Sequence, residues 1–377
     1  MIVLSRTDRS VLGRWWWTVD RWGVAAISFL VIVGIVLSYA ASPGVAVRYD
    51  YAQFHFVYRN FLFLVPSLMV LFAVSLLTPR QVRRVAALVF VLALALLVVT
   101  PFIGAEIKGA RRWIRVGIVS VQASEFVKPA FIVLSAWLFS EQNRDHSIPG
   151  NLLAALLYAL IIGLLFLQPD FGQIMLLSFT WGAMFFFSGL SWPWMAGLGG
   201  LAATGATGAY FYLPHVTSRI DRFFDPSSGD TYQVDRAMDA FQAGGLWGLG
   251  PGEGLVKRFI PDAHTDFVFA VAGEEFGLIS CLLLAGVFLF FVIRCLSRAT
   301  AEEDHFIQLT IAGLACLFGF QALINMAVTL SLIPAKGMTL PFISYGGSSL
   351  MATSLTVGML LALTRRRGAT ALSNEFA

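Results

Sequence analysis

The stretch WGVAAISFLVIVGIVLSYAA at residues 22–41 carries no charged side chain. A helix rises 1.5 Å per residue, so a run of roughly 20 apolar residues crosses the ~30 Å hydrocarbon core of a bilayer. Further apolar runs follow at 61–77, 85–102, 123–139, 152–167, 171–187, 194–213, 265–293, 306–332 and 345–363. The runs are continuous rather than alternating, which excludes a β-barrel. The sequence therefore predicts an all-α, polytopic membrane protein with ten transmembrane helices.

The composition agrees with a membrane protein. Of the 377 residues, 58% are hydrophobic and 13% are charged, whereas about 25% are charged in soluble domains. A soluble enzyme or binding module cannot bury so much apolar surface and is excluded. The three cysteines (Cys281, Cys295, Cys316) lie in or beside apolar runs, which excludes a secreted disulfide scaffold. The many bulky apolar residues also exclude a disordered chain.

Basic residues set the expected orientation. Arginine clusters at 80–84 and 365–367 are typical of cytoplasmic flanks, and tryptophans at 15–17 predict an interfacial anchor before a first span that is retained. We expect one membrane domain over 1–377, with a cytoplasmic N-terminus at 1–21, a large outer loop at 214–264 and a cytoplasmic tail at 364–377. Lys and Arg are usually more frequent on the cytoplasmic side of a membrane protein. Their presence in the outer segments 103–122 and 214–264 therefore indicates an anionic ligand at the outer face.

The large loop is predicted to contain local structure. Val234, Ala237, Met238 and Phe241 have the spacing of one helix face, which predicts a short amphipathic helix on the membrane or on the bundle. The glycine-rich stretch 244–254 follows. It contains no Gly-Lys-Ser/Thr, so it is not a phosphate-binding P-loop, and we interpret it as a hinge or lid.

Acidic residues at the start of the eighth run are the first candidates for chemistry. Asp266 is expected near the outer end of this helix, and Glu274 about 12 Å deeper on roughly the same face, beside Glu275. Carboxylates in a membrane span are costly and usually face a cavity or a partner. First-turn acids are also favoured by the helix dipole alone, and Glu274 or Glu275 could simply pair with a basic residue of a neighbouring helix.

Basic residues form the second group of candidates. Lys108, Arg111, Arg112 and Arg115 cluster within 108–115, which fits a pyrophosphate site or an interfacial contact with anionic headgroups. Glu125 and Lys128, three residues apart, could pair with each other, or Lys128 could face a central cavity.

A polar stretch at 334–349 separates the last two runs. Irregular backbone at this depth lines a cavity or allows close helix packing through small residues. The histidines show no metal-ligand spacing, and there is no nucleophile elbow, Cys/His site or nucleic-acid-binding stripe. We expect no metal and no cofactor, although the sequence leaves a need for a divalent cation open.

Six ordered motifs resemble those of the SEDS family (shape, elongation, division and sporulation) over nearly the whole chain. They are GARRWI at 109–114, QASEFVK at 122–128, QPDFG at 168–172, YQ at 232–233, AHTDF at 263–267 with GEE at 273–275, and KGMTLPFISYGGSS at 336–349. The last motif resembles the division members more than the elongation members. Ala123 and Gln173 stand where the family commonly has proline and threonine. Neither change removes a charge, so only local turn geometry is affected.

The resemblance implies a bacterial peptidoglycan glycosyltransferase that lies in the inner membrane, at the division septum. Such proteins polymerise lipid II at the periplasmic face and work with a class B penicillin-binding protein. The acid of the His-Thr-Asp-Phe motif, here Asp266, is essential in the family. Our hypothesis is an inverting transfer with Asp266 as general base and undecaprenyl pyrophosphate as leaving group.

The substrate-binding candidates are Arg111, Arg112, Glu125, Lys128, Tyr232, Gln233, His264, Thr265, Glu274, Lys336, Ser344, Tyr345 and Ser348. Expected partners are lipid II, the nascent glycan chain, the class B transpeptidase, other division proteins and membrane lipids, with no nucleic acid. The alternatives are a lipid II flippase, an elongation-type polymerase and a scaffold without chemistry.

Overall fold

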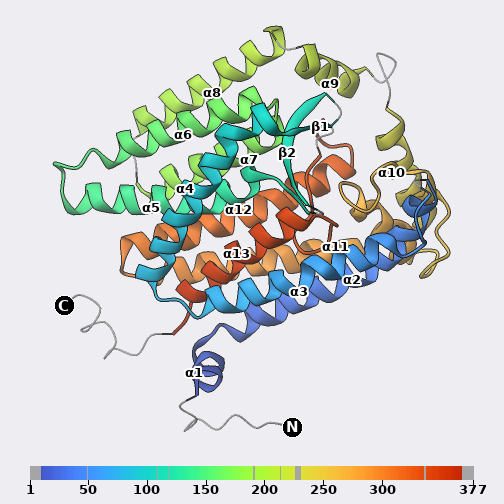
Figure 1. The fold of residues 1–377 in the computed structure, drawn as a ribbon, viewed down its shortest axis with the longest axis horizontal. Coiled ribbons are helices and arrows are strands. Elements are labelled where there is room, and N and C mark those ends of the chain that lie inside the picture. Colours follow the sequence, from blue (N-terminus) through green and yellow to red (C-terminus); the bar gives the residue numbers. More distant parts are fainter. Residues whose placement is uncertain are drawn as a thin grey trace.

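The computed structural model describes residues 10–48, 50–107, 109–117, 119–189, 192–212, 214–225, 231–334 and 337–366. Within these ranges each predicted run corresponds to one helix of a bundle (Figure 1). The helices are α2 (Arg21–Arg48), α3 (His55–Ser75), α4 (Pro79–Ile103), α5 (Ala123–Arg144), α6 (Gly150–Leu167), α7 (Phe171–Phe187), α8 (Trp192–Tyr212), α11 (Val268–Ala299), α12 (His305–Thr329) and α13 (Gly347–Leu363). The predicted helical membrane fold is confirmed.

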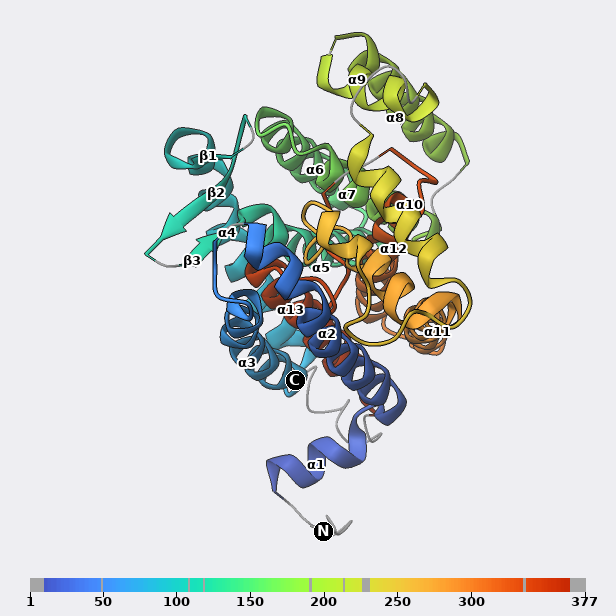
Figure 2. The same cartoon turned by 90° about the vertical axis from the view of Figure 1, so that its right-hand side faces the viewer.

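Seven of the described helices are long and apolar enough to cross a membrane: α2 to α6, α11 and α12. Two further apolar helices, α7 and α13, are shorter. The remaining predicted span, α8, is rich in glycine. In Figure 2 it projects from the bundle together with α9 (Pro214–Phe224).

The bundle has two distinct ends. The backbone amide of Arg366 donates to the carbonyl of Thr18 at 2.9 Å, so both described chain ends meet at what we call the terminal end, with the short helix α1 (Val11–Thr18). Here Arg294 donates two hydrogen bonds of 2.5 Å to Asp20 and so joins α11 to the start of α2. The opposite end, which we call the loop end, carries the connections discussed below.

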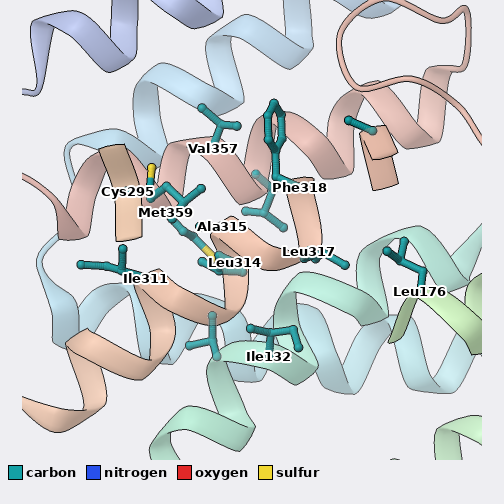
Figure 3. Packing of buried hydrophobic residues seen from close by; sticks show 14 of the residues in the cluster. Ile132, Leu176, Cys295, Ile311, Leu314, Ala315, Leu317, Phe318, Val357 and Met359 are labelled. Carbon is teal, nitrogen blue, oxygen red and sulfur yellow. The ribbon is translucent and has the colours of Figure 1, made fainter. Parts of the chain in front are cut away.

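The core of the bundle is built around α5 and α12. In its most apolar stretch, α5 has 83% of its residues buried inside the protein and α12 has 72%. In the other long spans the buried share is 39% or less, so their apolar side chains are left to face lipid. Figure 3 shows the side chains packed between them, including Ile132 and Leu314. At Gly313 an added methyl group would lie 2.6 Å from Ile132, so only glycine allows this close approach.

A small antiparallel sheet at the loop end was not predicted. Strands β1 (Ala105–Ile107), β2 (Ala110–Val116) and β3 (Val119–Val121) lie in that order between α4 and α5. Gly109 and Gly117 have φ values of 77° and 60°, which glycine adopts without strain, and they lie where the chain reverses between strands. The all-α prediction therefore needs this addition.

The large loop contains the predicted amphipathic helix. This is α10 (Tyr232–Gly244), which buries Ala237 and Ala240 and packs on α11. At its end, an added methyl group on Gly244 would lie 2.0 Å from the carbonyl oxygen of Gly273, so the two backbones touch. A 3-10 turn, η2 (Val256–Phe259), follows the glycine-rich stretch.

The helix α11 is broken at Gly277, where φ is 77° and ψ is 178°. The amides of 278–279 donate to the carbonyls of 245–246 (2.9 and 3.3 Å), and the amides of 249–250 donate to the carbonyls of 274–275 (2.9 and 3.0 Å). The glycine-rich stretch thus supplies the hydrogen bonds that the break removes. It is hydrogen-bonded to α11 on both sides of the break, an arrangement different from the hinge or lid that the sequence suggested.

Candidate active site

Asp266 lies in a tight turn at the loop end. The amides of Thr265 and Asp266 both donate to the carbonyl of Asp262, at 3.0 and 3.1 Å, and Asp262 has a φ of 55°. The helix α11 begins only at Val268, so Asp266 precedes the helix instead of lying within it as predicted. Its side chain is half-buried, and its backbone carbonyl accepts a 2.9 Å hydrogen bond from Asn325 of α12.

The segment 337–346 wraps around this turn. Ser344 donates its hydroxyl to the carbonyl of Thr265, and the amide of Tyr345 donates to the carbonyl of His264 at 2.9 Å. Asn325 also donates to the carbonyl of Met338 at 2.5 Å. The structure therefore brings four predicted residues together around Asp266: His264, Thr265, Ser344 and Tyr345.

Gly337 lies directly against the Asp266 carboxylate, since an added methyl group would be 2.9 Å from Oδ2. We expect Gly337→Ala to turn the carboxylate away. The expected polymerisation of lipid II should then slow by about 10- to 100-fold, because small misplacements of a reacting group are costly. Turnover and melting temperature should be measured together. Gly182→Ala is the control, because nothing lies within 4 Å of the added methyl group there. Equal turnover in the two variants would contradict this prediction.

Glu125 and Lys128 form a buried ion pair in α5. The Nζ of Lys128 lies 3.0 Å from Glu125 Oε2, and their side chains are 3% and 6% exposed. Lys128 also donates to Gln321 at 3.4 Å, and Glu125 accepts from Gln173 at 2.6 Å. The pairing considered from their spacing is thus present, and Lys128 also lines a small cavity of about 10 Å³.

A chain of polar contacts leads from this pair toward Asp266. The amide nitrogen of Gln321 donates to the carbonyl and hydroxyl of Thr339 at 3.1 and 3.2 Å, and Thr339 bonds to Ser349 at 2.5 Å. Gln321 and Asn325 lie four residues apart on α12, about one helical turn. One face of α12 therefore contacts both the Lys128 group and the Asp266 turn.

Arg112 and Arg111 alternate along β2 and face different partners. Arg112 donates to the carbonyls of Gln168 and Pro169 at 3.1 and 2.6 Å, and lies 3.9 Å from the carboxylate of Asp170. Arg111 instead pairs with the exposed Glu106 at 3.4 Å. The structure therefore orients Arg112, and not Arg111, toward the turn between α6 and α7.

Asp170 and Ser348 tie the neighbouring segments together. Burial raises the pKa of the Asp170 carboxyl, while the charge of Arg112 opposes this shift, and Gln122 donates to the carboxylate at 3.1 Å. Ser348 accepts from the amide of Gln122 and donates to the carbonyl of Ser120, both at 3.1 Å. The first turn of α13 is thereby attached to the sheet and to α5.

Glu274 has a position different from the one its sequence suggests. It is fully buried, and its two oxygens accept from the amides of Val256 and Lys257 at 2.7 Å each. Glu275 pairs with the ammonium group of Lys257, so an ion pair is present, but its partner lies in η2 of the large loop and not on a neighbouring membrane helix. In this structure Glu274 therefore holds η2 against α11 and presents no exposed surface.

Two other candidates lie on α10, in the large loop. Tyr232 and Gln233 begin α10, whose far end packs on α11, and Arg236 lies over the ring of Tyr232 at 5.3 Å. Lys336 lies outside the described residues, next to Gly337 in the sequence.

His264 is packed between aromatic rings. It is 9% exposed, and its ring centroid lies 4.4 Å from that of Phe56 and 5.3 Å from that of Tyr345. Its Nδ1 has no hydrogen-bond partner among the described residues. Burial lowers the pKa of His264 from 6.5 to about 4, and Asp262 opposes this shift. The imidazole is therefore neutral at physiological pH.

This burial predicts a pH dependence of stability. An unfolded chain protonates His264 near pH 6.5, whereas the folded protein does so only near pH 4. The effect of this group on the free energy of unfolding is therefore constant above pH 6.5. As the pH falls from 6.5 to 4 the free energy of unfolding decreases, and below pH 4 it is lower by about 3 kcal/mol. Melting temperatures of wild type and His264→Phe should diverge across the window, with the wild type losing more. Parallel curves would contradict the buried neutral imidazole.

The sequence interpretation missed Gln321, Asn325, Gln122 and Asp170 as members of the site. Gln321 and Asn325 offered a usable signal, because two amides four residues apart in a membrane span are costly unless they face polar partners. Among the described residues, no three His, Cys, Asp or Glu side chains group in a way that could hold a metal ion.

Comparison with known proteins identifies the family to which this chain is similar. A family model described as "Cell cycle protein", for FtsW, RodA and SpoVE, matches residues 21–368. The probable peptidoglycan glycosyltransferase FtsW of Caulobacter vibrioides is 48% identical, over 99% of this chain and 96% of the relative. That of Coxiella burnetii is 34% identical, over 92% and 96%.

Solved structures show the same fold. One is from work on polymerization and crosslinking by a peptidoglycan synthase complex, with a TM-score of 0.75 and 28% identity over 92% of this chain and 97% of that chain. Another is the rod shape determining protein RodA of Thermus thermophilus, with a TM-score of 0.67 and 27% identity over 93% and 98%. The resemblance predicted from the six motifs is confirmed, and the chain belongs to the SEDS family of FtsW, RodA and SpoVE.

Proposed function

We propose that this protein is a peptidoglycan glycosyltransferase that polymerises lipid II into glycan strands. The observation that carries the proposal is the half-buried carboxylate of Asp266, which is held at the loop end and linked through α12 to the buried ammonium group of Lys128. The names of the FtsW relatives, which match over nearly the full length, support the same activity.

The proposed step joins two lipid-linked sugars. Asp266 takes the proton of the acceptor's 4-hydroxyl while that oxygen bonds to the anomeric carbon of the growing chain. The bond from this carbon to the phosphate oxygen breaks on the opposite face, and undecaprenyl pyrophosphate leaves with the electron pair. General-base assistance of this kind accelerates a reaction by roughly 10²- to 10⁴-fold.

Cations at the loop end are proposed to stabilise the leaving pyrophosphate. Lys128 is fixed by Glu125, and Arg112 is oriented by two carbonyls and the nearby carboxylate of Asp170, with its side chain 30% exposed. The turn around the base is shaped by His264, Thr265, Ser344 and Tyr345. The buried Glu274 holds η2 of the large loop in place. Substrate binding remains a prediction for Arg111, Lys336, Tyr232, Gln233 and Ser348.

We propose that the loop end faces the periplasm, with 1–21 and 364–377 in the cytoplasm and 214–264 as the large periplasmic loop. We also propose that it acts at the division septum, with a class B penicillin-binding protein as partner. The family description "Cell cycle protein" and the similarity to FtsW relatives support a role in division. The structural relative from a complex of polymerization and crosslinking supports such a partnership.

The test is polymerisation by the purified protein in detergent, with lipid II supplied and with or without the cognate transpeptidase. We expect a ladder of glycan strands on a gel, increased by the partner. A flippase produces no polymer in detergent, and neither does a scaffold, so no strands in either arm would contradict the proposal. Rescue of septation rather than of rod shape in depleted cells would separate the division-type from the elongation-type polymerase.

A further inference from the structure

A row of aromatic rings begins beside the Asp266 turn. The rings of His264 and Tyr345 lie 5.3 Å apart, and both contact Phe56 of α3, at 4.4 and 5.7 Å. The inner end of the row is fixed, because the amide of Tyr345 bonds to the carbonyl of His264, two residues before Asp266.

The row continues outward along the connection between α2 and α3. His55 lies 5.4 Å from Phe56, and Tyr51 stacks on His55 at 4.3 Å with an interplanar angle of 13°. Tyr51 also meets Phe56 edge-on at 6.1 Å. Exposure rises along the row, from 8% at Phe56 to 51% at Tyr51. Rings that are ordered against one another thus lead from the candidate base to the surface.

Such a row has the chemistry of a sugar-binding surface. A pyranose ring presents C–H groups on its faces and polar groups at its edge, so it packs on an aromatic face while hydroxyls remain in water. Tyrosine and histidine match this pattern, because each combines a flat apolar body with a polar edge. Membrane-interface tyrosines share the same property, so exposure alone does not identify the ligand. The inner end of the row belongs to the Asp266 turn itself, and this position favours the sugar.

We infer that Tyr51 and His55, together with Tyr345, form a binding subsite for the sugar units of the growing glycan strand next to Asp266. This inference rests on the proposed function. A strand held there stays attached while successive units are added. Loss of the outer ring should therefore shorten the product, because each lost stacking contact speeds release of the strand.

The first experiment measures sugar binding without catalysis. A soluble β-1,4-linked tetramer of N-acetylglucosamine is titrated into the purified full-length protein and followed by saturation-transfer NMR. We expect Tyr51→Ala to weaken binding by about 2- to 10-fold, the range of one aromatic stacking contact. Tyr51→Phe, which keeps the ring, should restore most of the binding.

The control is Tyr58→Ala. Tyr58 is 73% exposed on the same helix end and takes part in no ring contact among the described residues. Its removal should leave tetramer binding unchanged. Melting temperatures of all variants separate a loss of binding from a loss of folding, since an interfacial anchor would alter stability and not sugar affinity.

The second experiment measures strand length. With lipid II as substrate, Tyr51→Ala and His55→Ala should give strands shortened by about 2- to 10-fold, whereas Tyr58→Ala should give wild-type lengths. Wild-type tetramer binding that depends on Tyr51, without any polymer, would support the subsite and reject the proposed function. Polymer of unchanged length together with unchanged tetramer binding in Tyr51→Ala would overturn the inference and leave the proposed function standing.

Discussion

Asp266→Asn should give a protein that inserts and folds normally but polymerises lipid II at least about 100-fold more slowly than wild type. The amide has the size of the carboxylate, so it keeps the contact with Gly337 and leaves the backbone hydrogen bonds of the turn in place. It cannot accept the proton of the acceptor hydroxyl. Turnover of lipid II by purified protein, with melting temperature measured in parallel, is the direct check.

The matched control is Asp262→Asn in the same turn. It removes the same charge four residues earlier, and asparagine tolerates the φ of 55° at this position. The backbone carbonyl that holds the turn is retained, so most of the activity should remain. Polymerisation at the wild-type rate by Asp266→Asn would end the assignment of this residue as the base.

Lys128→Met should be the most destabilising of the substitutions considered. Removing one member of a buried ion pair leaves the other charge without compensation, at a cost of about 3–5 kcal/mol. Among the described residues, Glu125 would keep only the hydrogen bond from Gln173, at a position where its side chain is 6% exposed. We expect a large fall in melting temperature together with loss of polymerisation. A wild-type melting temperature would show that the carboxylate finds another partner.

The double variant Glu125→Gln/Lys128→Met separates structure from chemistry. With both charges gone, no uncompensated carboxylate remains, so most of the lost stability should return. Polymerisation should stay low, because the pyrophosphate still lacks the ammonium group. Recovery of both properties would reduce the pair to a structural element and remove Lys128 from the catalytic proposal.

The helices of this fold were predictable because their signal is local. A run such as 22–41 identifies a span without reference to any other part of the chain, and the spacing of Glu125 and Lys128 already indicated their pairing. The amphipathic pattern around Ala237 likewise identified α10. In each case one segment contains all the information that the prediction needed.

The features that escaped prediction depend on contacts between distant segments. The proximity of Gly337 to Asp266 follows from how α12 positions two loops, and no local pattern encodes it. Glu274 looked like a site residue because it is an acid near a span, but its partners are backbone amides of another segment. In the sheet at 105–121, β1 and β3 have three residues each, too few for a clear alternation signal.

The interruption at Gly277 divides α11 into two mechanical parts. The glycine-rich stretch bonds to both parts, since residues 249–250 donate to the carbonyls of 274–275 before the break and residues 245–246 accept from the amides of 278–279 after it. The part before the break leads from the Asp266 turn, and the part after it is a membrane helix tied to the start of α2 by Arg294 and Asp20. The glycine-rich stretch therefore bridges the break and sets the orientation of the short helical part that follows the Asp266 turn. A substitution within 245–250 should therefore disturb the position of the carboxylate through the backbone, without any contact between the substituted residue and the site.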